Sequence, residues 1–103
     1  MRYKQVFFSL PESIQAVVCK VVENAHPKQV ILFGSQARKD HRENSDFDLC
    51  VIQKNCHETA WTKILVDISE EPWSLYRIDL VEFEKLNDEY KKNIHNDGVI
   101  LYE

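Results

Sequence analysis

One stretch of the chain, residues 29–53, constrains the fold more than any other. Its first part, residues 29–33, is an apolar run that ends at Gly34, one of only two glycines in 103 residues. A strand that ends at glycine can turn sharply and approach a ligand closely, because glycine has no side chain and tolerates left-handed backbone angles. After a polar loop, residues 46–53 return to strand-like alternation. The pattern predicts two strands flanking a ligand-binding turn.

The second strand carries a pair of acids, Asp46 and Asp48. Residues two apart on a strand point to the same face, so these carboxylates project together. Ionised carboxylates repel each other at this separation, and a divalent cation between them would remove the repulsion. The alternative is that both acids belong to the solvated face of an edge strand.

The segment after Gly34 has the features of a phosphate site. A helix that opens at Ser35 would offer free backbone N–H groups and the positive end of its dipole to an anion. Arg38 lies three residues further on, on the same helical face, where it can reach phosphate oxygens. Gly-Ser after a strand is also an ordinary strand-to-helix turn. The order and spacing of all these features together favour the functional interpretation.

These residues resemble the signature of the minimal nucleotidyltransferases, members of the DNA polymerase β-like superfamily. The family pattern is an apolar strand, Gly-Ser, Ala-Arg-Gly, a short loop and Ser-Asp-x-Asp. The matching positions are Gly34, Ser35, Ala37, Arg38, Ser45, Asp46 and Asp48. Lys39 departs from it, since the family usually has glycine there. If that glycine adopts a positive φ, Lys39 implies a different loop path.

A third acid, Asp79, lies in the apolar run Leu75–Phe83, which predicts a third strand. Alternation places Asp79 with Arg77 and Val81 on one face. An unpaired carboxylate in such a strand is costly, so either a structural ion pair or a function explains it. The resemblance implies that Asp79 completes the metal site with the acids at 46 and 48. Asp67, within a helical pattern, is the weaker competitor.

Further elements follow from spacing and terminal signals. Residues 9–12 predict a capping box led by Ser9, and the helix after it ends before Pro27. Its apolar stripe consists of Ile14, Val17, Val18, Val21, Val22 and Ala25. Helices are also predicted over residues 57–71 and 87–96. The apolar end, residues 99–102, is interpreted as part of a last helix returning to the body of the domain.

The predicted fold class is α/β (α+β): a small mixed β-sheet with helices on one face. The resemblance implies the polymerase β palm-like nucleotidyltransferase fold. A length of 103 residues predicts a single domain over residues 1–103. A helical covering on one face would leave the carboxylate face open, as an active site requires.

Composition excludes several functions. The net charge of −4 argues against general nucleic-acid binding, and no apolar run reaches membrane-spanning length. The N-terminus lacks the apolar core of a signal peptide. Three cysteines without framework spacing predict reduced thiols in a cytoplasmic protein. Cys50, Cys56 and His57 match no zinc spacing, so no soft-metal site is predicted.

The resemblance and two-metal chemistry together predict the reaction. Two Mg²⁺ ions would be held by the three acids, and Gly34, Ser35, Arg38 and Ser45 would position the nucleotide. The reaction would transfer a nucleoside monophosphate from a nucleoside triphosphate, AMP from ATP, to a hydroxyl. The resemblance implies a helical HEPN-type partner whose tyrosine accepts the AMP, with the chain acting as antitoxin.

Two alternatives stay open. The chain could neutralise or scaffold a helical partner by binding alone, an interpretation to which Lys39 points. It could also be a small-molecule nucleotidyltransferase assembled as a homo-oligomer. The sequence leaves the acceptor, the base preference and the oligomeric state undetermined.

Overall fold

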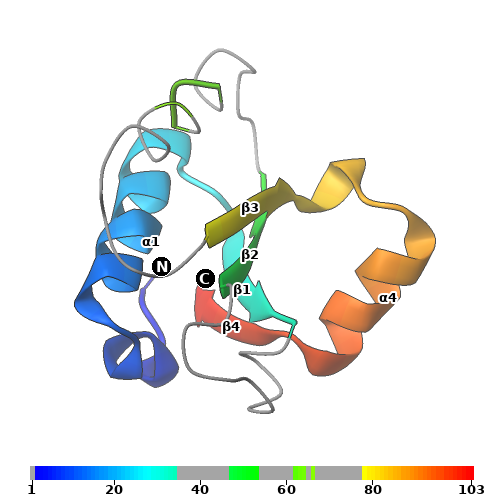
Figure 1. Cartoon of the computed structure of the whole chain (residues 1–103), viewed down its shortest axis with the longest axis horizontal. Helices are drawn as coiled ribbons and strands as arrows, with labels where there is room; N and C mark the ends of the chain where they lie inside the picture. Colours follow the sequence, from blue (N-terminus) through cyan, green and yellow to red (C-terminus); the bar gives the residue numbers. More distant parts are fainter. Residues whose placement is uncertain (1, 35–46, 54–61, 65, 67–77) are drawn as a thin grey trace.

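The computed structural model describes residues 2–34, 47–53, 62–64, 66 and 78–103. Four strands form one sheet in the order β3-β2-β1-β4 (Figure 1). Their bounds are β1 Gln29–Phe33, β2 Phe47–Ile52, β3 Ile78–Glu82 and β4 Val99–Tyr102. β1 pairs antiparallel with β2 and β4, and β2 pairs parallel with β3. The predicted mixed sheet is therefore confirmed.

Two 3₁₀ turns and two longer helices lie wholly within the described residues. Their bounds are η1 Gln5–Ser9, α1 Glu12–Ala25, η2 Phe83–Lys85 and α4 Asp88–Asp97. In the predicted helix over residues 57–71, the described positions 62–64 and 66 are helical, and Ile64 is buried in the core. Asp67 lies outside the described residues, as do Trp61, Leu65 and Ile68, the other apolar positions of this predicted helix.

α1 covers one face of the sheet, as its apolar stripe predicts. Its buried side chains pack against alternate residues of the central strands, among them Val30 and Leu32 of β1 and Leu49 and Val51 of β2. Every buried position of α1 belongs to the predicted stripe, and Val22 is partly buried against the same cluster. Hydrophobic burial of this stripe fixes the helix on the sheet.

The capping box is wrong. Ser9 belongs to η1, where its hydroxyl donates a hydrogen bond to the carbonyl of Val6 at 2.7 Å. α1 begins one residue after Pro11, whose carbonyl accepts from the backbone N–H of Ile14 and of Gln15, each at 3.0 Å. The Ser9 hydroxyl is used by the preceding turn, and within the described part of the chain no side chain caps α1.

The helices do not all lie on one face, which corrects the predicted arrangement. α4 lies on the side of the sheet opposite α1 (Figure 1), with buried Ile94 packed against Ile31 and Cys50. Gly98 permits this close approach, because a Cβ atom there would lie 2.6 Å from the Cγ2 of Ile31 and would also meet the Ile94 carbonyl. The central strands are therefore apolar on both faces where the helices cover them.

The chain ends in a strand instead of a helix. Residues 99–102 form β4, which pairs with β1, and Tyr3 bridges to Tyr102 on its other side. A four-residue segment is too short for a stable helix, whereas its β-branched residues and tyrosine favour a strand. Pairing also satisfies the backbone groups along the outer edge of β1. The strand was missed because periodicity cannot classify so short an apolar run.

No helix within the described ranges is long and apolar enough to cross a membrane.

The buried thiol of Cys50 makes the packing on the α4 face testable by pH. Burial first, and then the charge of Glu84, raises the pKa of Cys50 from 9.0 to about 12. The folded state disfavours the thiolate relative to the unfolded state. The stability that the neutral, buried thiol contributes is therefore complete below pH 9 and is lost as the pH rises toward about 12. Denaturant titrations should show a steeper loss of unfolding free energy across this range for the wild type than for Cys50→Ala.

Val51→Ala is the matched control, since it shortens a buried side chain of the same strand without removing an ionisable group. It should keep the wild-type pH slope. Parallel slopes for the wild type and Cys50→Ala would contradict the assigned burial of the thiol.

Candidate active site

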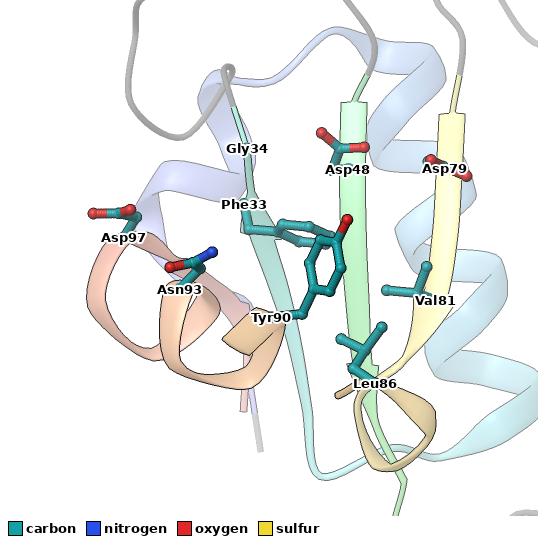
Figure 2. A pocket seen from close by; sticks show the side chains of 9 residues that line it. All are labelled: Phe33, Gly34, Asp48, Asp79, Val81, Leu86, Tyr90, Asn93 and Asp97. Atoms are coloured by element: carbon teal, nitrogen blue, oxygen red, sulfur yellow. The ribbon is translucent and has the colours of Figure 1, made fainter. Parts of the chain in front are cut away.

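A cavity of about 390 Å³ lies between the sheet and α4 (Figure 2). Within the described part of the chain, the side chains and backbone that line it come from β1, β2, β3, α4 and the turns beside them. These residues are Phe33, Gly34, Asp48, Asp79, Val81, Leu86, Tyr90, Asn93 and Asp97. The volume falls in the range of small-ligand sites.

Two carboxylates stand side by side at one end of this cavity. The parallel pairing of β2 with β3 places Asp48 directly opposite Asp79, and the antiparallel pairing of β1 with β2 places Phe33 on the other side of Asp48. Neighbouring strands are about 4.8 Å apart, so the two carboxylates are immediate neighbours on one face. Figure 2 shows both at the same level of the sheet. Their mutual repulsion favours a bound cation.

The turn after β1 lies against one of these carboxylates. Gly34 has a positive φ of +76°, and a Cβ atom there would overlap the Asp48 Oδ2 and lie 3.2 Å from its Cγ. The backbone angle therefore favours glycine here, and a side chain at this position would also displace the Asp48 carboxylate. The positive φ agrees with the sharp turn predicted for this glycine.

The base of the cavity is apolar. Phe33, Val81 and Leu86 are half-buried and pack against the cluster of Ile31, Cys50 and Ile94. Apolar surroundings lower the local dielectric, so the attraction between the carboxylates and a cation is screened less than in bulk water. The same surface offers apolar area to a ligand that reaches into the cavity.

The opposite wall belongs to α4, and sequence reasoning missed it. Tyr90, Asn93 and Asp97 follow each other at intervals of three and four residues and share one helical face. Asn87 caps the helix, its Oδ1 accepting a hydrogen bond from the backbone N–H of Tyr90 at 2.9 Å. The signal was present in that spacing, but polar residues on a helix usually indicate only a solvated face.

The structure brings together three of the seven predicted site residues: Gly34, Asp48 and Asp79 all line the cavity. The remaining four, Ser35, Arg38, Ser45 and Asp46, lie outside the described residues. Among the described side chains no set of three metal ligands is found. Asp48 and Asp79 supply two carboxylate donors, the hard oxygen ligands that Mg²⁺ prefers.

The comparison with protein families decides what kind of domain this is. The family described as "Polymerase beta, Nucleotidyltransferase" matches residues 15–103. The chain belongs to this nucleotidyltransferase family. The match confirms the superfamily suggested by the resemblance and agrees with the mixed sheet. A search of curated proteins finds no significant match.

Several solved structures share the fold. A toxin–antitoxin crystallised with AMP-PNP has a TM-score of 0.61 and 19% identity, over 82% of this chain and 69% of that chain. A mutant of the toxin–antitoxin MntA–HpeT has a TM-score of 0.65 and 19% identity, with coverages of 89% and 72%. A protein provisionally described as a minimal nucleotidyltransferase has a TM-score of 0.65 and 22% identity, with coverages of 90% and 93%. At these identities the likeness concerns the fold.

The contact between Gly34 and Asp48 can be tested by a double-mutant cycle. Gly34→Ala should lower the unfolding free energy by about 1–2 kcal/mol for the positive φ, and further for the overlap with the Asp48 carboxylate. In an Asp48→Ala background only the φ cost should persist. Urea titrations of the four proteins measure the coupling. Equal costs of Gly34→Ala in both backgrounds would show that the carboxylate does not oppose an added Cβ atom at this position.

Proposed function

We propose that the protein is a Mg²⁺-dependent nucleotidyltransferase that moves AMP from ATP to a hydroxyl group. The observation that carries the proposal is the pairing of Asp48 with Asp79 at one end of a ligand-sized cavity. Family membership supports transferase chemistry, and adjacent carboxylates on a sheet face are the arrangement that cation-assisted phosphoryl chemistry uses.

Asp48 and Asp79 fit the role of metal ligands by their donor chemistry and by their position in neighbouring strands. Asp46, two residues before Asp48, is proposed as the third ligand. Bound Mg²⁺ would supply Lewis acidity at the reacting phosphate and neutralise the charge of the departing pyrophosphate. Removal of the cation with a chelator should therefore abolish transfer.

The chain's own groups position the reactants. The turn at Gly34 brings backbone close to Asp48, and the triphosphate is proposed to lie over this turn, held by Ser35, Arg38 and Ser45. Asp79 is exposed, so an acceptor hydroxyl can reach it from solvent. Its carboxylate is proposed to take the hydroxyl proton as the new P–O bond forms and pyrophosphate leaves.

The proposed acceptor is a tyrosine hydroxyl of a helical HEPN-type partner, which the chain would silence as an antitoxin. Two considerations support a protein acceptor. The cavity that the described residues line has the volume of a single small-ligand site. Similar solved structures include toxin–antitoxin pairs, one of them with AMP-PNP.

Cys19 and Cys50 are free thiols, in keeping with a cytoplasmic location.

Transfer of radiolabel from [α-³²P]ATP to the partner encoded beside this protein tests the proposal. Asp48→Asn and Asp79→Asn should each reduce transfer at least about 100-fold, because several kcal/mol of transition-state stabilisation would be lost. Glu89→Gln is the control: it removes an exposed charge of α4 that does not line the cavity. It should transfer at the wild-type rate.

Two results would overturn the proposal in different directions. Tight association with the partner that survives Asp48→Asn, with no label transferred by the wild type, would identify a binding antitoxin. Label that appears on a small hydroxyl compound without the partner would identify a small-molecule nucleotidyltransferase.

A further inference from the structure

The two ends of the cavity differ chemically. Asp48, Asp79 and the turn at Gly34 form the end that is proposed to bind cations and phosphates. The α4 wall offers an aromatic ring, an amide and a further carboxylate. Phosphate transfer needs none of these three groups. The wall is therefore suited to a ligand part that is planar, partly apolar and rich in hydrogen-bonding groups.

Tyr90 is the dominant surface of this wall. It is 54% exposed although it lines the cavity, so much of its ring is available to a ligand. In Figure 2 the ring stands in front of Phe33 and above Leu86, with its hydroxyl directed toward the level of Asp48. A planar ring that stacks on Tyr90 would remove apolar surface from water and gain the aromatic contact as well.

The helix backbone that carries Tyr90 is fixed before any ligand binds. Its backbone N–H is capped by Asn87, and one turn further on Ile94 is buried against Ile31 and Cys50. Stacking on Tyr90 therefore has to order only the torsions of its side chain and not the helix, which lowers the entropic cost of binding.

The polar groups of the wall follow the ring on the same helical face. Asn93, between Tyr90 and Asp97 on the helix, has an amide that can both donate to and accept from a base edge or a sugar hydroxyl.

We propose that α4 is the nucleoside wall of the site: the ring of Tyr90 stacks on the nucleobase, and the Asn93 amide hydrogen-bonds to the base or the ribose. This inference rests on the proposed function and assigns its nucleoside subsite. We place the acceptor beside Asp79, because in Figure 2 Asp79 lies at the edge of the site opposite Asn93 and Asp97.

Two probes separate the nucleoside from the phosphates. The first is α,β-methylene-ATP, which cannot transfer its AMP, and the second is inorganic tripolyphosphate; both are titrated calorimetrically with Mg²⁺. Tyr90→Ala should weaken binding of the nucleotide analogue about tenfold, as expected for one stacked base. It should leave the affinity for tripolyphosphate within about twofold of the wild-type value, since the ring contacts only the nucleoside. Tyr90→Phe keeps the ring and should bind the analogue as the wild type does.

Matched controls exist for both side chains. Phe8→Ala removes another exposed aromatic, 64% exposed and outside the cavity, and should leave both affinities unchanged. Asn93→Ala should weaken binding of the analogue about fivefold, the loss expected for one hydrogen bond. Asn96→Ala, which removes an exposed amide of α4 that does not line the cavity, should not.

The outcomes distinguish this inference from the proposed function. If the wild type binds the analogue and Tyr90→Ala binds it equally well, the nucleoside wall is wrong while the nucleotide site stands. The nucleoside wall is also wrong if Tyr90→Ala weakens the binding of both probes alike, because the site as a whole would then be disturbed. If the wild type binds neither probe, both proposals fail.

Discussion

The arrangement of the whole site depends on the parallel pairing of β2 with β3. This pairing places the carboxylates of Asp48 and Asp79 in neighbouring strands on one face of the sheet. Apolar residues alternate with them along both strands. Leu49 and Leu80 pair in the next row and pack into the core beneath α1. The opposite face keeps the two carboxylates, which are oxygen ligands of the kind that Mg²⁺ prefers.

The two faces of the sheet have different roles. One face joins α1 to the central strands in the larger core cluster, and this cluster fixes the register. The other face carries the two carboxylates and is partly covered by α4, whose Ile94 packs against Ile31 of β1. The register and the position of α4 together form the cavity. The apolar base and the acidic end are thus consequences of strand alternation on a single face.

The sequence predicted what depends on local periodicity. The bounds of β1, the buried stripe of α1 and the shared face of Asp79 and Val81 all follow from alternation or helical spacing. Sequence reasoning failed for segments whose structure depends on contacts with distant parts of the chain. β4 is a strand because the edge of β1 needs a partner, and Ser9 is used by η1 instead of capping α1. The α4 wall was missed because Tyr90 and Asn93 line the cavity only through the packing of α4 against the strands, which the sequence of the helix does not show.

The central claim is that Asp48 and Asp79 jointly hold a divalent cation, and Mn²⁺ substitution tests it most directly. Crystals grown with Mn²⁺ and α,β-methylene-ATP should show an anomalous peak about 2 Å from carboxylate oxygens of both residues. The peak should disappear in Asp48→Asn crystals. An ordered nucleotide without such a peak, or a Mn²⁺ ion bound away from this pair, would contradict the account.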